Sequence, residues 1–248
     1  MAEKVVVITG ASAGVGAALA ELLSTQGMAV VLVARRKEAL ESVAATCGSR
    51  ARVVIADMSK RDDVRRTVAE AIAAFGHIDV WINNVGQGIT RQPSELTDDD
   101  IDHVMSLNVK SALYGMQEVL PHFKSRNAGH VINVSSMLGR IPFATFRSAY
   151  CAAKHFLNAL TATFRAEVQT THPDIQFSLV SPGVVRTEFG LNARHGGVDS
   201  RTLPQSQSAE EVADVIARVI ASRQPDVYTR PGASKTIADY YASVGVDG

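Results

Sequence analysis

Short runs of apolar, mostly β-branched residues alternate along the chain with longer segments in which apolar residues recur at helical spacing. After the first run, for example, Val15, Leu19, Leu22 and Leu23 would share one face of a helix. Such alternation is typical of βαβ units, whose helices cover both faces of a parallel sheet. The pattern predicts an α/β fold with about seven strands, at Val5–Thr9, Ala29–Val33, Arg52–Ala56, Val80–Asn83, His130–Ser135, Gln176–Ser181 and Val227–Thr229.

The organisation of the chain is expected to be simple. With 248 residues and no repeat or linker-like stretch, residues 1–248 are predicted to form a single domain. Acidic residues at 98–100 favour a long helix that begins after Thr97, with Pro121 in or near its end. Residues 188–208 are rich in Gly, Ser and Arg and lack clear periodicity, so we expect a mobile loop beside the substrate.

Composition excludes several functional classes. The 25 basic and 25 acidic residues balance, so no net field favours nucleic acid or an anionic membrane. The apolar run 5–8 is far too short for a signal peptide or a membrane span. Cys47 and Cys151, the only cysteines, lack metal-binding spacing. We therefore expect a cytoplasmic protein with no metal and with no nucleic-acid or membrane partner.

A glycine-rich turn follows the first predicted strand directly. Residues 9–16 read TGASAGVG, and the helical pattern begins inside this segment. Glycines here let backbone N–H groups approach a pyrophosphate, whose charge is favoured at a helix N-terminus. A plain tight turn is the alternative, but the flanking strand and helix favour a Rossmann-type, doubly wound parallel sheet with a dinucleotide site. Its candidate residues are Gly10, Ser12, Gly14, Val15 and Gly16.

The end of the second predicted strand indicates which dinucleotide binds. An NAD site places a carboxylate there for the ribose 2′-hydroxyl, whereas this chain has Arg35 and Arg36, and no carboxylate before Glu38. Guanidinium groups suit a 2′-phosphate through paired hydrogen bonds. The sequence therefore predicts NADP(H) as the cofactor, with two solvated arginines at a helix start as the alternative.

Tyr150 and Lys154 lie four positions apart in the segment SAYCAAKHFL, residues 148–157. On a helix they would be neighbours, and the ammonium would favour the ionised phenol. A phenol normally titrates near about 10, which is too high for efficient proton transfer at neutral pH. We therefore predict that Lys154 lowers the pKa of Tyr150 and makes it an acid or base toward a substrate oxygen. An exposed pair with an extended lysine is the alternative.

The chain as a whole, from Thr9 to about Thr187, resembles the short-chain dehydrogenase/reductase family in its compact single-domain branch. TGASAGVG resembles the family's T-G-x-x-x-G-x-G loop, and NNVG at 83–86 resembles N-N-A-G with valine in place of alanine. VSS, which ends at Ser136, resembles the serine motif, and Tyr150 with Lys154 resembles Y-x-x-x-K. SLNVKS at 106–111 and PGVVRT at 182–187 resemble two further family segments.

The resemblance implies roles for other residues. Asn108 would hold a proton-relay water through its backbone, and Asp57, with Met58, would contact the adenine after the third strand. Lys154 would also hold the nicotinamide ribose, which Tyr150 adjoins. The other implied cofactor-binding residues are Asn84 and Gly86 in the N-N-A-G segment, and Pro182, Gly183, Val185 and Thr187 around the nicotinamide.

The spacing of the serine departs from the family. Ser136 lies 14 residues before Tyr150, and the common family spacing of 13 would select Met137, which cannot donate a hydrogen bond. A one-residue insertion in the loop around 139–147 explains this more simply than loss of the serine. Ser135 is the less favoured donor, because adjacent strand residues point to opposite faces.

Activity and assembly are implied by the resemblance. It implies an NADP(H)-dependent oxidoreductase that interconverts a ketone or aldehyde and an alcohol, with carbonyl reduction as the favoured direction. Ser136 would polarise the oxygen and Tyr150 would transfer the proton. A catalytically silent NADP(H)-binding regulatory or partner-binding module is the alternative, because fold does not determine activity. Similar proteins form homodimers or homotetramers through the helices that begin near Asp98 and Ser148.

The substrate itself is the least determined feature. Four apolar residues flank the catalytic segments and are candidates for a substrate wall or for the core: Phe143, Phe146, Phe189 and Leu191. A wall would favour medium-sized hydrophobic carbonyl compounds. Arg186, Arg194 and His195 leave room for an anionic group instead, and the sequence does not decide between the two.

Overall fold

The central strands carry apolar residues on both faces rather than at alternate positions only, so both of their faces must be covered. The computed structural model describes residues 4–245, in which all residues of the five inner strands are buried. The strands of this part of the chain are β1 (Val5–Thr9), β2 (Ala29–Ala34), β3 (Ala51–Ile55), β4 (Val80–Asn83), β5 (Gly129–Val134), β6 (Ile175–Ser181) and β7 (Asp226–Tyr228).

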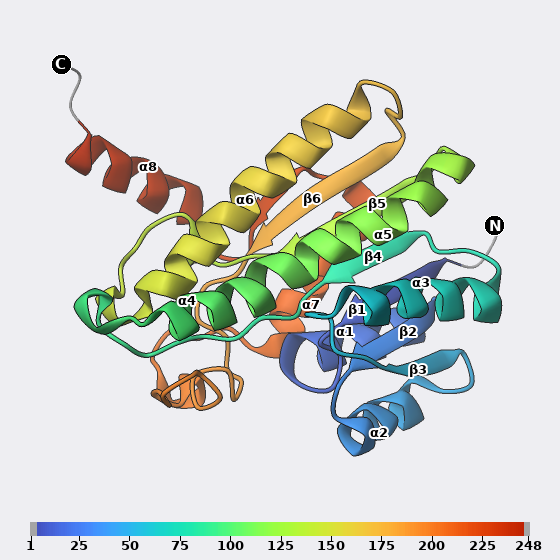
Figure 1. Cartoon of the computed structure of the whole chain (residues 1–248), viewed down its shortest axis with the longest axis horizontal. Coiled ribbons are helices and arrows are strands. Elements are labelled where there is room, and N and C mark those ends of the chain that lie inside the picture. The colour runs from blue at the N-terminus through green and yellow to red at the C-terminus, as the bar shows by residue number, and fades with distance from the viewer. Residues whose placement is uncertain (1–3, 246–248) are drawn as a thin grey trace.

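These strands form one parallel sheet in the order β3-β2-β1-β4-β5-β6-β7, with helices on both faces (Figure 1). The predicted Rossmann-type fold is confirmed, and no strand bound differs from its predicted position by more than one residue. The described helices are α1 (Gly14–Thr25), α2 (Lys37–Cys47), α3 (Arg61–Phe75), α4 (Asp98–Met105), α5 (Ser111–Arg126), α6 (Ser148–Gln169), α7 (Ala209–Ser222) and α8 (Ala233–Val244).

Two apolar layers hold the helices to the sheet. On one face, α1, α2 and α7 bury residues such as Leu19, Leu40 and Ile216. On the other face, α3, α5 and α6 contribute residues such as Val64 and Phe123. The strand order changes direction between β1 and β4, and an open α/β sheet has its crevice at the carboxyl ends of the strands at such a point.

The acidic segment 98–100 does begin a long helical stretch. Thr97 and Asp100 form a capping box at the start of α4, and a π-helical turn, Ser106–Lys110, joins α4 to α5. Pro121 lies inside α5, before its end at Arg126. The helical stretch therefore brings its N-terminal end to the same side of the molecule as the 188–208 segment (Figure 1).

Residues 188–208 contain only one short 3₁₀ turn, Ser200–Thr202. Backbone bridges tie the segment and its flank to neighbours, Ile89 to Arg194 and Val185 to Gln207. The mobility expected for this segment stays a prediction. Within residues 4–245, no helix combines the length and the apolar character that crossing a membrane requires.

Candidate active site

The end of β5 presents the two serines to different neighbours. The Ser136 side chain lies near enough to the Tyr150 hydroxyl to lower its pKa, and the Ser136 hydroxyl accepts from Leu138 N at 3.1 Å. The Ser135 hydroxyl instead donates to Asn158 Oδ1 at 2.5 Å. Ser136 is therefore the serine that the fold brings to the phenol, and Met137 begins a 3₁₀ turn.

Helix α6 places Tyr150 and Lys154 on one buried face, with 7% and 3% of their surfaces exposed. The Lys154 Nζ lies 5.7 Å from the centre of the tyrosine ring. It donates to the carbonyl of Val134, the last residue of β5, at 3.0 Å. This bond fixes the amine beside the serine-bearing end of the strand, so the three predicted catalytic side chains converge.

The predicted effect of Lys154 on the phenol is wrong for this structure. Burial raises the pKa of Tyr150 to about 12, and the hydrogen bond with Ser136 and the charge of Arg147 oppose this rise. Burial also lowers the pKa of Lys154 to about 8. Desolvation thus dominates at both groups, since both are withdrawn from water, and Lys154 is not among the groups that shift the pKa of the phenol. Tyr150 is a phenol that holds its proton at neutral pH.

Asn108 lies in the π-helical turn, and its side chain is fully buried. The amide accepts from Gln87 N at 3.2 Å and donates to Gln87 O at 2.9 Å. A Cβ on Gly86 would lie 2.8 Å from Asn108 Oδ1 and 3.5 Å from Lys154 Nζ. The loop after β4 therefore passes between Asn108 and Lys154, and glycine is what allows this approach.

The glycine-rich turn has the shape that a dinucleotide requires. Gly10 and Gly14 have φ of 68° and 56°, a conformation that glycine adopts readily. A Cβ on Gly16 would lie 2.4 Å from Gly10 O, so α1 can pack this closely only with glycine there. Asn84 Nδ2 donates to Thr9 O and Gly10 O and so holds the turn. The residues present fit a pyrophosphate at this helix N-terminus.

Two arginines border the same turn. The Arg36 side chain donates to the Ser12 hydroxyl at 3.1 Å, and the Arg35 side chain is exposed at the end of β2. Asp57, after β3, accepts from Ser59 N and from its hydroxyl at 3.0 and 2.7 Å. Met58 is buried in the core, so only its backbone is free to meet a cofactor.

The segment after β6 closes the other side of the turn. The closest neighbour of a Cβ on Gly14 would be Thr187 Cγ2 at 3.1 Å. A Cβ on Gly183 would instead collide with the Arg230 side chain, 2.4 Å from Nε. Pro182 is buried, and its carbonyl accepts from Met137 N at 2.7 Å. The fold therefore brings the predicted nicotinamide segment to both the glycine turn and the serine-bearing loop.

The four candidate wall residues differ in their contacts. The Phe189 ring centre lies 5.6 Å from that of Tyr150, in an edge-on contact. Phe143 is 60% exposed and contacts Tyr240 of α8, with ring centres 6.1 Å apart. Phe146 and Leu191 are also exposed. Of the four, only Phe189 has a ring contact with Tyr150.

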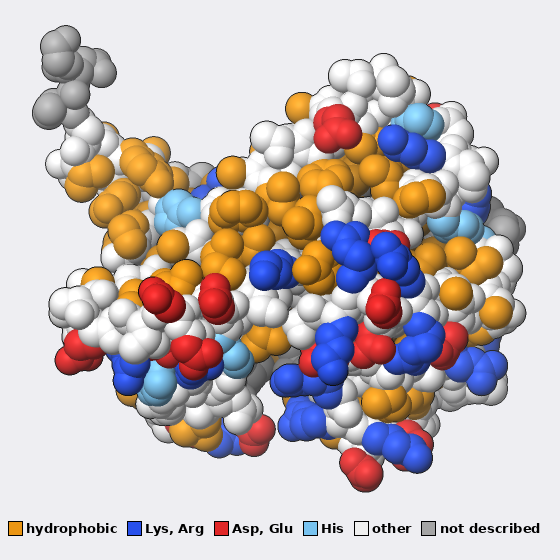
Figure 2. All heavy atoms as spheres, in the orientation of Figure 1, with side chains coloured by type: hydrophobic (Ala, Val, Ile, Leu, Met, Phe, Trp, Pro, Cys, Tyr) orange, Lys and Arg blue, Asp and Glu red, His pale blue; other side chains and the backbone are white. Residues whose placement is uncertain are grey.

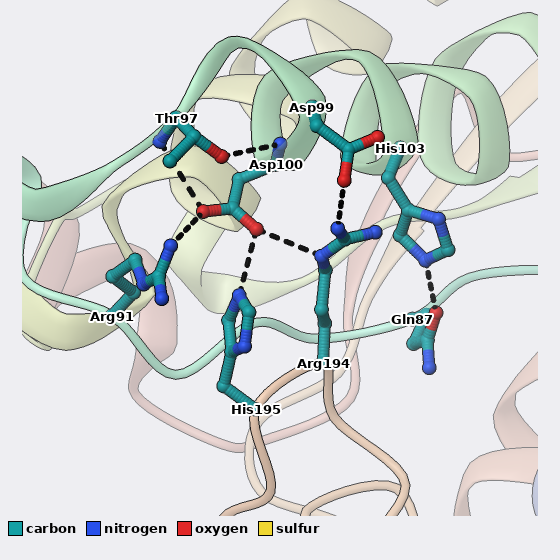
Figure 3. Close-up of polar contacts among 8 residues, drawn as sticks. All are labelled: Gln87, Arg91, Thr97, Asp99, Asp100, His103, Arg194 and His195. Carbon is teal, nitrogen blue, oxygen red and sulfur yellow. Dashed lines mark hydrogen bonds and ion pairs between the residues drawn. The ribbon is translucent and has the colours of Figure 1, made fainter.

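The clearest feature that sequence reasoning missed is a polar cluster around Asp100 (Figure 3). This carboxylate is fully buried and accepts from Arg91 Nη1 at 2.8 Å, Arg194 Nε at 2.7 Å and His195 Nε2 at 2.7 Å. The hydrogen bond from His195 is the largest of the effects that hold the pKa of Asp100 well below its usual range. The sequence identified Asp100 only as a helix cap, because its loop partners lie about 95 residues away.

A second polar contact ties the same elements together. His103 Nε2 is hydrogen-bonded to Gln87 Oε1 at 2.7 Å, and Gln87 Nε2 donates to Asn192 O at 2.6 Å (Figure 3 draws the first). Gln87 thus links α4, the 188–208 segment and, through its backbone, Asn108. Arg194 and His195, which the sequence left open as anion ligands, are engaged by α4.

The model of the short chain dehydrogenase family matches residues 4–196. The chain belongs to this family. An uncharacterised oxidoreductase of Staphylococcus epidermidis is 34% identical over 223 residues, which cover 90% of this chain and 92% of that protein.

Solved structures of short-chain dehydrogenases agree with this membership. One from Burkholderia phymatum, in complex with NAD, superposes with a TM-score of 0.88 at 25% identity and covers 99% of this chain and 97% of its own. A 3-ketoacyl-(acyl-carrier-protein) reductase from Brucella melitensis, complexed with NADH, gives 0.82 at 25% identity, with 91% and 95% covered. This chain is therefore an oxidoreductase of the short-chain dehydrogenase family. Within residues 4–245, no three or more His, Cys, Asp or Glu residues are grouped as metal ligands would be.

Proposed function

We propose that this protein is an NADP(H)-dependent carbonyl reductase, which converts a ketone or aldehyde into an alcohol with Tyr150 as the proton donor. The observation that carries the proposal is the convergence of the Ser136 hydroxyl, the Tyr150 phenol and the Lys154 amine at the end of β5. Burial keeps the phenol protonated at neutral pH, so Tyr150 can give its proton to the much stronger base, an alkoxide, that hydride addition makes of the carbonyl.

In this mechanism each side chain has one task. Ser136 donates a hydrogen bond to the substrate oxygen and orients it toward Tyr150. Tyr150 transfers its proton to that oxygen. Lys154, fixed to Val134 O at 3.0 Å, holds the cofactor ribose and lies beside the phenol. Asn108 keeps the loop after β4 in place, and NADP(H), when bound, supplies the hydride.

Removing the hydroxyl of Tyr150 tests whether this residue is the proton donor. We expect Tyr150→Phe to lower kcat for NADPH oxidation with a panel of ketones and aldehydes at least about 100-fold, a typical contribution of a positioned acid. The kcat of Ser136→Ala should fall by a similar factor. Ser135→Ala removes the hydrogen bond to Asn158 and should retain most of the turnover. Equal turnover by wild type and Tyr150→Phe would reject the assigned acid.

The preference for NADP(H) is inferred from Arg35 and Arg36. Both are exposed at the end of β2, and Arg36 donates to Ser12 in the glycine turn, so their charge borders the position of the ribose. Neither arginine has an ion pair with Asp or Glu within residues 4–245. We expect Arg35→Asp to lower the ratio of kcat/KM for NADPH to that for NADH by about tenfold or more, because it removes one charge-assisted hydrogen bond to the 2′-phosphate. Unchanged discrimination in both Arg35→Asp and Arg36→Asp would contradict the assignment.

A catalytically silent NADP(H)-binding module remains the competing function, because fold alone does not establish turnover. Tight NADPH binding without activity on any carbonyl or alcohol of a broad panel would favour it. The convergence of Ser136, Tyr150 and Lys154 supports the enzyme.

We also propose that the enzyme acts in the cytoplasm as a homodimer or homotetramer. Figure 2 shows hydrophobic side chains gathered over the face formed by α5 and α6. Phe156 on α6 and Ile101 on α4 are 49% and 41% exposed. Apolar side chains of this size at the surface favour a protein interface. Light scattering that gives the monomer mass at micromolar concentration would reject the assembly. Cys47 and Cys151 are both buried free thiols, as a reducing compartment allows.

A further inference from the structure

Arg147 lies three residues before Tyr150, at the N-terminal end of α6. Its Nη1 donates to Ile89 O at 3.2 Å. Its guanidinium carbon lies 5.7 Å from the centre of the Phe146 ring. Within residues 4–245 it has no ion pair with a carboxylate. Arg165 and Arg223, which are also partly buried, have none either, but each of them donates to two backbone carbonyls. Burial lowers the pKa of Arg147, and its charge interacts with the Tyr150 phenol and the Cys151 thiol. A half-buried cation without a counter-charge is costly to keep.

Two glycines make room for this guanidinium. A Cβ on Gly88 would lie 2.5 Å from Arg147 Nη1. A Cβ on Gly197 would lie 2.5 Å from the backbone oxygen of Gly190 and 3.0 Å from Arg147 Nη2. Neither glycine has a positive φ, so backbone conformation does not require glycine at either position. Because these positions lack side chains, the loop after β4 and the 188–208 segment both approach the guanidinium without covering it by side chains of their own.

A second donor faces the same place. The Thr90 hydroxyl is buried and has no hydrogen-bond partner within the described residues. It lies 3.1 Å from the Cβ position of Gly197, the point that is 3.0 Å from Arg147 Nη2. Buried hydroxyls are normally hydrogen-bonded, so an unpaired hydroxyl next to a guanidinium that has no carboxylate partner needs an explanation. An oxyacid group would satisfy both.

The pair adjoins the proposed reaction centre. The Cβ position of Gly88 is 2.5 Å from Arg147 Nη1 and 3.2 Å from Phe189 Cε1, so the guanidinium and this ring are neighbours. The centre of the Phe189 ring lies 5.6 Å from that of Tyr150. Figure 2 shows the surface indented between the 188–208 segment and the first βαβ unit. A substrate oxygen at Tyr150 would therefore leave the rest of a small molecule close to Arg147.

We propose that Arg147, with the Thr90 hydroxyl, binds an anionic oxyacid group of the substrate, so that the enzyme reduces ketones or aldehydes that carry a carboxylate or a phosphate. The inference rests on the proposed carbonyl reduction and names its substrate class. Arg194 and His195 are held by the buried Asp100. Among the charges that act on the Tyr150 phenol, Arg147 is the cation, and it has no carboxylate partner within the described residues.

Matched substrate pairs test the proposal by kinetics with NADPH. The carboxylates are 3-oxobutanoate, levulinate and 5-oxohexanoate, each compared with its methyl ester, and the phosphate is 4-hydroxy-2-butanone phosphate, compared with the free alcohol. For wild type, kcat/KM should be higher for at least one of the anions than for its neutral partner. Whether that anion is a carboxylate or the phosphate identifies the oxyacid group that Arg147 binds. Arg147→Gln should reduce this preference by about tenfold to hundredfold, as expected for one charge-assisted hydrogen bond. Arg147→Lys should restore part of it.

Arg186→Gln is the matched control, since it removes a nearby exposed cation and should leave the preference intact. Reduction of the neutral esters as readily as of the acids by wild type would overturn the substrate class and leave the reductase proposal standing. Loss of the preference in Arg186→Gln but not in Arg147→Gln would also overturn it. A fall for all substrates alike in Arg147→Gln, with a shifted pH profile, would show that Arg147 acts on Tyr150 instead.

Binding gives a readout that does not depend on turnover. Calorimetric titration of levulinate and of 4-hydroxy-2-butanone phosphate into the NADP⁺-bound protein, which has no hydride to transfer, should show saturable binding of at least one anion, weakened at least about tenfold by Arg147→Gln. Unchanged NADPH affinity and melting temperature in the variant would establish that it folds. Equal anion binding by wild type and variant, or none by either, would contradict the proposal even if no carbonyl compound were reduced.

Discussion

At the scale of single residues, burial moves the two ionisable groups of the site in opposite directions. It raises the pKa of Tyr150 to about 12 and lowers that of Lys154 to about 8. Both shifts favour the neutral forms, so the phenol is kept as a proton donor and the amine loses its charge more easily than a solvated lysine does. The sequence could predict that the two groups meet, because helical spacing fixes that, but not how far each is withdrawn from water.

The depressed pKa of Lys154 predicts a pH dependence of stability. The unfolded lysine has a pKa near 10.5, so between pH 8 and 10.5 the unfolded chain binds more protons than the native state, and native stability rises with pH. The Lys154→Met variant has no amine at this position, so its stability lacks this rise with pH. The free energy of unfolding of the variant minus that of wild type should therefore fall by about 3 kcal/mol across this window. Urea titrations without cofactor measure it, and a constant difference would refute the shift.

At the scale of elements, the carboxylate of Asp100 joins α4 to the 188–208 segment through Arg194 and His195 (Figure 3). The acidic start of α4 was readable from the sequence, since a capping box is a local pattern. Its second role was not, because the partners are distant in sequence and the loop has no periodicity that would place it. The same reason hid Arg147, whose environment is built from two loops.

Removing the charge of Asp100 should release the loop. Asp100→Asn keeps an oxygen for the helix cap but weakens the bonds from Arg194 and His195, so trypsin should cleave after Arg194 or Arg201 about tenfold faster. Asp99→Asn is the matched control, because Asp99 is 81% exposed and pairs with Arg194 alone. Its cleavage rate should stay close to that of wild type. Equal rates in all three proteins would show that Asp100 does not hold the segment.

At the scale of the whole molecule, the sheet brings together segments that the sequence could only order along the chain. The apolar runs predicted the strands because inner strands are buried on both faces, and the glycine turn located the carboxyl edge. Side-chain direction at that edge was less predictable. Adjacent residues of an extended chain point to opposite sides, so only one of the two serines can face the phenol. In the structure this is Ser136, whereas Ser135 is hydrogen-bonded to Asn158. The scattered phenylalanines shared no element, so nothing local could place them.

Transfer of deuterium tests the central claim most directly. NADPH labelled with two deuterium atoms at C4 of the nicotinamide is incubated with enzyme and a reducible ketone, and the alcohol is analysed by mass spectrometry. We predict one deuterium at the former carbonyl carbon with wild type, and at least about 100-fold less labelled alcohol per unit time with Tyr150→Phe. Labelled alcohol formed at the same rate by both proteins, or by neither with any carbonyl compound, would contradict the account.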